Sequence, residues 1–256
     1  GDGDDTIRLN NGTNSVLAGS GVDTITVTSG TNTVDAGLGD DVITLEAGNN
    51  TAFGASGADS ITANNGTNVI DAGTENDTIN LNNGTNSLVA GSGADTITAA
   101  NGTNTIDAGF GDDVITLING TNYLVAGTGA DTIWAASGIN SMDAGDGADL
   151  ITLNSGNNTV FGASGADSIN ANNGTNVIDA GTENDTITAN SGTNTITAGE
   201  GDDTIALNNG NNSVVAGSGL DNITANSGNN TISAGDGDDT ITLNNGTNSV
   251  LAGSGV

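Results

Sequence analysis

The sequence contains no cysteine, proline or histidine, and these absences exclude several kinds of protein. Without cysteine there are no disulfides, and without histidine zinc and imidazole chemistry lose their usual ligand and base. Arg8 is the only basic residue in 256, so we expect no binding to nucleic acid, which requires clustered Lys and Arg. No apolar run approaches the length of a membrane span, so we expect no membrane insertion.

Aromatic residues are also scarce, whereas acidic residues bring the net charge to -30. Such a composition is typical of disordered chains, but the order of the residues indicates a repeat. An aspartate stands at every eighteenth position from Asp5 to Asp239, without insertion or deletion. An isoleucine follows two residues after each of these aspartates, and an asparagine follows nine residues after each.

Each repeat consists of two nine-residue halves, for example Ala18–Thr26 and Leu81–Val89. Both halves have a glycine-containing turn followed by a short polar–aliphatic–polar stretch. In a strand this alternation places the aliphatic residue inward and its two neighbours outward. All five aromatic residues lie outside the inward positions, which indicates a core too narrow for rings.

One such coil cannot bury its aliphatic side chains alone, whereas stacked coils can. The sequence therefore predicts an all-β protein, a parallel β-roll or β-solenoid with 18 residues per coil, about 14 coils, and two short strands and two turns per coil. We expect residues 1–256 to form a single continuous array. The chain starts and stops within a coil and shows no capping segment, so we also expect it to be an excerpt of a longer array.

A column of aspartates about 4.8 Å apart is unfavourable unless a cation lies between the carboxylates. Calcium suits this position, because it is hard and takes six to eight oxygen ligands, including backbone carbonyls from glycine-rich turns. An alternative is that the aspartates are simple turn residues, which are common in turns of any protein. The predicted calcium ligands are Asp5, Asp23, Asp41, Asp59, Asp77, Asp95, Asp113, Asp131, Asp149, Asp167, Asp185, Asp203, Asp221 and Asp239.

The aspartate half of the repeat, as in Gly19–Ile25 and Gly235–Ile241, resembles the glycine- and aspartate-rich nonapeptide of the RTX family, the hemolysin-type calcium-binding repeats. That resemblance implies a parallel β-roll with calcium in the turns. It also implies a secreted bacterial protein, such as a toxin, protease, lipase, adhesin or surface-layer protein. In this chain the alternate halves carry Asn instead of Asp, so we expect one calcium edge and one edge of stacked amides. Glu75 and Glu183 replace a turn glycine, which predicts distorted sites or an added carboxylate.

No repeat departs from the pattern to form a catalytic constellation, so we expect no enzyme activity in this segment. The favoured function is a calcium-binding extracellular structural protein, such as the shaft of a giant adhesin, a fibre or a surface coat. One alternative is a ligand-binding face for ice or polysaccharide, suggested by outward pairs such as Thr24 and Thr26. Another is the RTX tail of a secreted toxin or enzyme.

Self-association into longer rods or bundles is predicted from a second period of 36 residues. At the last outward position of one strand, an apolar residue alternates with an aspartate from Leu17 to Asp179, and Thr197 then takes the next apolar place. A regular apolar row is a candidate contact between copies, although these side chains also suit a role in shielding the sheet edge. The apolar members are Leu17, Phe53, Val89, Val125, Phe161, Val215 and Leu251.

Overall fold

The computed structural model describes residues 1–255, and within this range the regular structure consists of strands and no helix. Consequently, these residues include no apolar helix that could cross a membrane. The chain divides into two compact units, Gly1–Thr128 and Gly129–Val256. Both units are parallel β-solenoids with coils of 18 residues, which confirms the predicted fold class.

In the first unit, short and long strands alternate along the chain and belong to two different parallel sheets. The short strands are β1 (Thr6–Leu9), β3 (Thr24–Val27), β5 (Val42–Leu45), β7 (Ser60–Ala63), β9 (Thr78–Leu81), β11 (Thr96–Ala99) and β13 (Val114–Leu117). The long strands are β2 (Thr13–Ser20), β4 (Thr31–Leu38), β6 (Asn49–Ser56), β8 (Thr67–Thr74), β10 (Thr85–Ser92), β12 (Thr103–Phe110) and β14 (Thr121–Thr128).

The second unit repeats this arrangement with two further sets of parallel strands. Its short strands are β15 (Thr132–Ala135), β17 (Leu150–Leu153), β19 (Ser168–Ala171), β21 (Thr186–Ala189), β23 (Thr204–Leu207), β25 (Asn222–Ala225) and β27 (Thr240–Leu243). Its long strands are β16 (Ile139–Asp146), β18 (Asn157–Ser164), β20 (Thr175–Thr182), β22 (Thr193–Glu200), β24 (Asn211–Ser218), β26 (Asn229–Asp236) and β28 (Thr247–Leu251).

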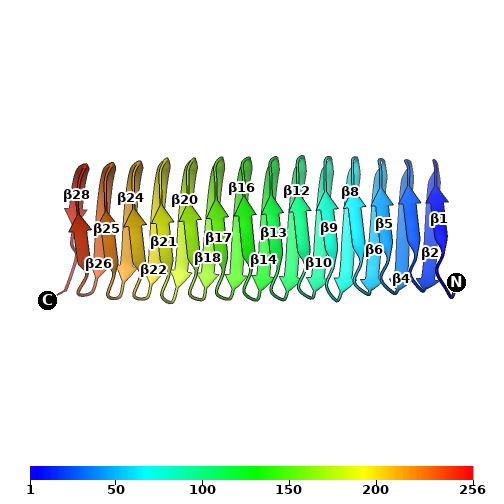
Figure 1. Ribbon diagram of the computed structural model, residues 1–256, viewed down its shortest axis with the longest axis horizontal. Coiled ribbons are helices and arrows are strands. Elements are labelled where there is room, and N and C mark those ends of the chain that lie inside the picture. Colours follow the sequence, from blue (N-terminus) through cyan, green and yellow to red (C-terminus); the bar gives the residue numbers. More distant parts are fainter. Residues whose placement is uncertain (256) are drawn as a thin grey trace. The chain divides into compact units, whose positions relative to one another are not determined.

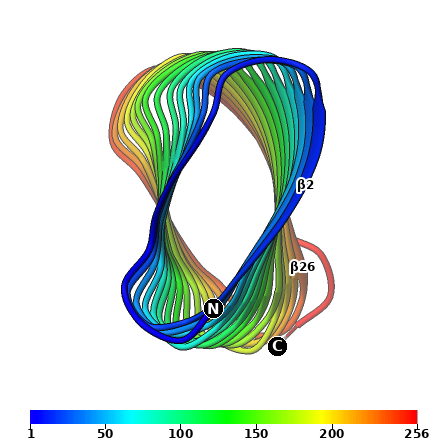
Figure 2. The same ribbon diagram turned by 90° about the vertical axis from the view of Figure 1, so that its right-hand side faces the viewer.

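Within each unit, the paired strand residues lie 18 positions apart along the chain. Ile7 pairs with Ile25 and Ile25 with Ile43, so the isoleucines predicted to point inward form one column. Figure 1 shows successive strands of each sheet running in the same direction, and Figure 2 shows how each coil encloses the interior. Equivalent residues of neighbouring coils therefore contact one another directly, about 4.8 Å apart.

The core is a set of aliphatic columns, as predicted from the alternation. Strand β3 buries Ile25 and Val27, and strand β4 buries Val34 and Ala36 together with Asn32. All five aromatic side chains are exposed, since columns of Ile, Leu, Val and Ala already fill the narrow interior. The exposed aromatic residues are Phe53, Phe110, Tyr123, Trp134 and Phe161.

The two strands of a coil differ in length, which the similarity of the two nine-residue halves did not predict. Each short strand has four residues, whereas the long strands before β28 have eight. The long strand begins before the ladder asparagine and continues through the Ala–Gly pair, as in Asn32 and Ala36–Gly37 of β4. Segments such as Ala18–Gly19, expected to open a turn, are therefore the last part of a strand.

Candidate metal centre

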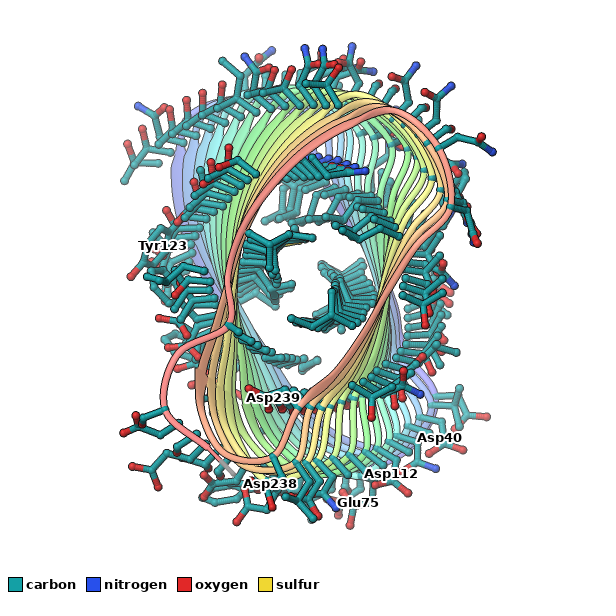
Figure 3. The ribbon with its side chains drawn as sticks, turned by 90° about the vertical axis from the view of Figure 1, so that its left-hand side faces the viewer. Asp40, Glu75, Asp112, Tyr123, Asp238 and Asp239 are labelled. Atoms are coloured by element: carbon teal, nitrogen blue, oxygen red, sulfur yellow. The ribbon has the colours of Figure 1, made fainter. Side chains whose placement is uncertain are left out.

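The ladder aspartates lie immediately before the short strands and point into the coil. Every member from Asp23 to Asp221 is buried, with at most 2% of its surface exposed. The acidic residue just before a ladder aspartate has the opposite orientation. In Figure 3, Asp239 of the ladder points inward while its neighbour Asp238 points outward. The sequence predicted the column but not its burial, because aspartate in a turn is usually exposed.

One oxygen of each buried carboxylate accepts a hydrogen bond from the preceding coil. The backbone N–H of Asp23 donates to Oδ1 of Asp41 at 2.7 Å, and that of Asp41 donates to Oδ1 of Asp59 at 2.7 Å. The other oxygen, Oδ2, is also buried but has no hydrogen-bond partner in many rungs, which is costly for a charged group. This holds for Asp23, Asp41, Asp59, Asp77, Asp95, Asp149, Asp167, Asp185, Asp203, Asp221 and Asp239.

Burial raises the pKa of nine ladder carboxyl groups from the ordinary value of 3.8, namely those of Asp41, Asp59, Asp77, Asp95, Asp149, Asp167, Asp185, Asp203 and Asp221. Desolvation is the largest cause; the backbone hydrogen bond partly opposes it, and neighbouring carboxylates add to it. The pKa rises to about 7 for Asp77 and Asp185, and to about 6 for Asp59, Asp149, Asp167 and Asp203. In the absence of a cation the fold therefore favours protonation of the ladder, and a bound cation would favour the ionised form.

The ladder asparagines from Asn32 to Asn230 lie at the start of the long strands, beside the opposite turn, and are similarly buried, and Asn32 shows how their amides are bonded. Asn32 Nδ2 donates to Asn50 Oδ1 at 2.9 Å and to the backbone carbonyl of Ser29 at 3.2 Å. Asn32 Oδ1 accepts from Asn14 Nδ2 at 2.7 Å. The same pair of donations recurs at Asn50, Asn68, Asn86, Asn158, Asn176, Asn194, Asn212 and Asn230. The predicted ladder of stacked amides is confirmed by these bonds.

A second asparagine column, which the sequence analysis missed, lies on the outer side of the same turn in the second unit. Asn172 Nδ2 donates to Asn154 Oδ1 at 3.0 Å, and Asn190 Nδ2 donates to Asn172 Oδ1 at 2.8 Å. The column continues in the same direction through Asn208, Asn226 and Asn244. Asparagine at six successive 18-residue intervals was the available signal, and it indicates further stabilisation of this turn without charge.

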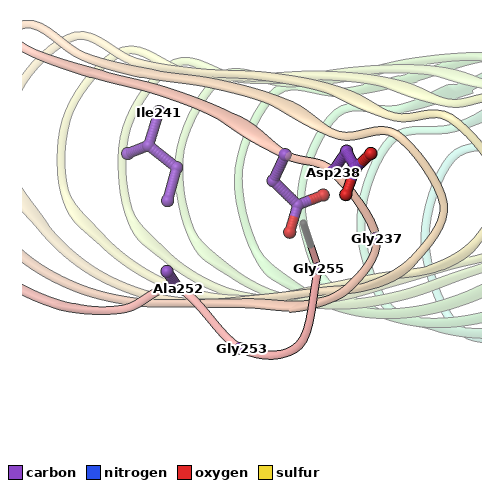
Figure 4. Close-up of a pocket in the computed structure, with 7 residues that line it drawn as sticks. Gly237, Asp238, Ile241, Ala252, Gly253 and Gly255 are labelled. Carbon is purple, nitrogen blue, oxygen red and sulfur yellow. The ribbon is translucent and has the colours of Figure 1, made fainter.

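The aspartate turn has the chemistry that a hard cation requires. Its buried Oδ2 atoms recur once per coil beside glycine-rich backbone, so successive coils supply carboxylate and carbonyl oxygens to one column. Residues 1–255 contain no group of three Asp, Glu, His or Cys side chains arranged to hold a metal. A cavity of about 340 Å³ in the last coil shows these components together, as Asp239 lines it with Gly237, Gly253 and Gly255 (Figure 4).

Acidic residues just before the ladder point outward, and several hydrogen-bond to a neighbouring coil. The backbone N–H of Val22 donates to Asp4 Oδ1 at 2.9 Å, and that of Leu220 donates to Asp202 Oδ1 at 2.7 Å. Figure 3 shows Asp40 and Asp112 on this outer side of the turn. These carboxylates therefore add negative charge near the ladder without entering the interior.

Glu75 and Glu183 do bring an extra carboxylate to their turns. Glu75 Oε2 accepts hydrogen bonds from the Gly57 N–H at 2.9 Å and the Thr74 hydroxyl at 2.6 Å, which lowers the pKa of Glu75 below its ordinary value. Both glutamates take a positive φ, 75° and 74°, which is the conformation of the glycine they replace. The turn thus keeps its path, and the glutamate side chain reaches back to the preceding coil.

A parallel solenoid with a buried carboxylate column in one turn belongs to the metal-binding repeat proteins. The family model of the RTX calcium-binding nonapeptide repeat matches most of the chain, so the chain belongs to the RTX calcium-binding repeat family and calcium is its ion. The matched segments are residues 1–25, 17–52, 26–61, 46–79, 80–115, 118–151, 152–187, 179–214, 188–223 and 215–250. The resemblance predicted from the nonapeptide is confirmed.

Comparison with solved structures supports the same fold. The chain is similar to the crystal structure of a hyperactive, Ca2+-dependent, beta-helical antifreeze protein from an Antarctic bacterium, with a TM-score of 0.66 and 21% identity. The match covers 91% of this chain and 83% of that protein. At this identity the likeness shows the fold alone. No curated protein matches the chain significantly.

Proposed function

We propose that the chain is a secreted, non-catalytic structural element whose rigidity comes from calcium bound along the aspartate turn. The observation that carries this proposal is the repeated buried Oδ2 atom without a hydrogen-bond partner. Calcium held by Asp carboxylates of successive coils and by turn carbonyls would remove that defect once per coil. All fourteen ladder aspartates, from Asp5 to Asp239, are the proposed ligands.

Calcium would couple folding to location. Metal that binds only the folded state stabilises it by mass action, so the solenoid would form where calcium is abundant. Calcium in the millimolar range outside the cell suits this scheme, because extracellular calcium modules bind in that range. The proposed setting is the extracellular space or the cell surface of a bacterium, as the shaft of an adhesin, a fibre or a surface coat.

Two measurements, one on whole cells and one on the purified chain, test this proposal. Immunogold labelling should place the chain in fibres or a coat outside the cell, and label confined to the cytoplasm would contradict the location. Force spectroscopy on the purified chain should show mechanical resistance in calcium that disappears in EDTA. Equal resistance in both solutions would contradict the role of calcium as the source of rigidity.

Ice binding is a second candidate function, supported by the outward threonines of the short strands and by the antifreeze protein that shares the fold. Thr6 pairs with Thr24, so threonines of neighbouring coils form rows on one face. The rows are interrupted, for example by Val42 and by Trp134. Ice shaping by the purified chain in calcium would support this function, and growth of unshaped ice crystals would contradict it.

We also propose that copies of the chain associate laterally through the row of alternating apolar and acidic residues. In the first unit, Leu17, Phe53 and Val89 are 72%, 38% and 44% exposed, with Asp35 and Asp71 between them. An in-register partner would place apolar beside apolar side chains, with calcium between facing aspartates. Replacing Phe53 and Val89 with Ser should reduce association in sedimentation experiments in calcium, and unchanged association would exclude this contact.

A further inference from the structure

Two turns of the aspartate edge depart from the repeat in the same two ways. At the inward position five residues before the ladder aspartate, eleven coils have Ala followed by Gly, but two coils have the reverse order, Gly54–Ala55 and Gly162–Ala163. In the coil that follows each reversed Gly–Ala segment, a glutamate replaces the second glycine of the turn, at Glu75 and at Glu183. The two departures occur together in both units and in no other coil.

The reversed Gly–Ala order removes a methyl group from the interior of the turn. A Cβ atom at Gly54 would overlap Asp59 Oδ2 and the carbonyl oxygen of Ala72, so both oxygens point into the space that the methyl group would fill. The same holds at Gly162, where the two oxygens belong to Asp167 and Ala180.

In both turns the carboxylate oxygen that points into this space is buried and lacks a hydrogen-bond partner. Asp59 is 2% exposed and Asp167 is 1% exposed, and Oδ2 of each is unsatisfied. Two oxygen atoms therefore converge on the position that an alanine Cβ holds in ordinary turns, which is a starting ligand set for a cation.

The glutamate changes the hydrogen bonding of the same turn. In ordinary turns the glycine N–H donates to a carbonyl of the next coil, as from Gly39 to Ser56 at 2.8 Å. In the departing turns Gly57 donates instead to Glu75 Oε2 at 2.9 Å, and Gly165 donates to Glu183 Oε2 at 2.8 Å. The glycine N–H therefore donates to a carboxylate in place of a backbone carbonyl of the next coil. The glutamate also adds a negative charge where the two coils meet.

We propose that these two turns are a separate, tighter class of calcium site, one in each unit. Calcium affinity rises with the number of charged ligands and neighbouring charges, and Glu75 acts electrostatically on both Asp59 and Asp77. The missing methyl group lets Asp59 Oδ2 and the Ala72 carbonyl oxygen approach the Gly54 backbone, so these turns bring two oxygens together where ordinary turns carry an alanine Cβ. This inference rests on the proposed function, because it ranks sites along the same aspartate edge.

The two sites would make calcium loading stepwise. Each unit would bind its first ion at its departing turn, and coils on either side would then order by stacking on a fixed neighbour. Stability in a solenoid arises from contacts between adjacent repeats, so a single ordered coil is sufficient to start this process. Ordinary turns would fill at higher calcium concentration.

Calcium titration by calorimetry tests the proposal with the full chain. The wild type should bind two ions at least about tenfold more tightly than the rest, because these turns combine two converging oxygens with the added carboxylate of the glutamate. The combined variant Gly54→Ala, Ala55→Gly and Glu75→Gly restores the ordinary turn in the first unit only. It should bind one tight ion, with the untouched turn at Asp167 as an internal reference.

This variant is designed to keep the fold intact. Each change introduces the residue found at the equivalent position of the ordinary turns. It also places glycine at two positions with positive φ, 78° at Ala55 and 75° at Glu75, where glycine is unstrained. Glu200→Ser is the matched control, because it removes one negative charge from an exposed position of another turn.

The control should retain two tight ions. A single class of sites in the wild type, or two tight ions in the restored variant, would overturn the inference while leaving calcium binding in place. Absence of calcium binding in every chain would instead contradict the proposed function.

Discussion

In the coil that contains Asp41 and Asn50, the buried amide bonds through every polar atom, whereas the buried carboxylate leaves one oxygen without a partner. Asn50 both donates to and accepts from its neighbours in the stack, at 3.0 Å to Asn68 and 2.9 Å from Asn32. Asp41 accepts one backbone N–H, and its Oδ2 remains unsatisfied. The two turns differ by one functional group at an equivalent buried place.

The difference follows from the donors and acceptors of the two groups. An amide carries an NH₂ and a carbonyl, so a column of amides is self-complementary along its length. A carboxylate is an acceptor only, so a column of carboxylates needs a proton or a cation to complete it. The solenoid therefore has one turn that is complete by itself and one turn whose stability depends on calcium and on pH.

Chelation should give the largest effect, because it affects every aspartate turn at once. In excess EDTA the chain should lose most of its strand signal in circular dichroism and expand in solution. Calcium should restore both, whereas magnesium at the same concentration should not, since it requires near-ideal octahedral geometry. Full strand content in EDTA would show that the aspartate turn is as self-sufficient as the asparagine turn.

Lower pH should partly replace calcium at the aspartate turn. The folded-state pKa is about 7 for Asp77 and Asp185 and about 6 for Asp59, against an ordinary value of 3.8. Between about pH 4 and pH 7 the folded chain binds more protons than the unfolded chain, so its stability falls as pH rises through that window.

Strand signal in circular dichroism, measured in EDTA at pH 5 and pH 8, tests this dependence. More of the strand signal should remain at pH 5, and equal or greater signal at pH 8 would contradict the raised pKa values. In saturating calcium the trend should reverse, because protons compete with the ion for the same carboxylates.

Replacing a ladder asparagine with aspartate tests whether the amide column depends on its own donors and acceptors. Asn212→Asp should lower the free energy of unfolding by about 3 kcal/mol, because it removes the donations to Asn230 Oδ1 and the Asn209 carbonyl and buries a charge. Asn212→Ala should cost about 1–3 kcal/mol. Denaturant unfolding in saturating calcium gives both values, and an Asp variant as stable as the wild type would contradict the self-complementary amide ladder.

The reciprocal exchange is Asp203→Asn with Asp221→Asn in two adjacent aspartate turns. The Oδ1 atoms still accept the backbone N–H groups, but the charge of both rungs is lost. Equilibrium dialysis should show a loss of about one ion per removed carboxylate. In EDTA the variant should be more stable than the wild type, and unchanged ion binding would exclude these residues as ligands.

An exposed acid of the same turn should have the smallest effect. Asp202→Asn keeps the acceptor for the Leu220 N–H but removes a charge outside the coil. Calcium affinity should change by no more than about twofold, since exposed charges are screened by solvent and salt. A loss comparable to that of the double ladder variant would show that the outer acids, and not the buried ladder, hold the ion.

Much of the fold was predictable because the repeat specifies the same local choice fourteen times. Ile25 and Val34 are inward, Phe53 is outward, and neighbouring coils pair in an 18-residue register, as the alternation and spacing indicated. The difference in strand length was not predictable from the two similar halves. It depends on how Asn32 and Gly37 continue the pairing with the next coil, which only the stack provides.

By itself, the sequence determined the coil length, the inward columns and the identity of the ion, since periodicity and residue type carry that information. Only the tertiary structure decided that the ladder aspartates are buried, which oxygen of Asp59 lacks a partner, and that Glu75 reaches the Gly57 N–H. The physical reason is that these interactions join residues 18 positions apart. They exist only when one coil rests on the next, so their geometry depends on stacking and not on the local residues of either turn.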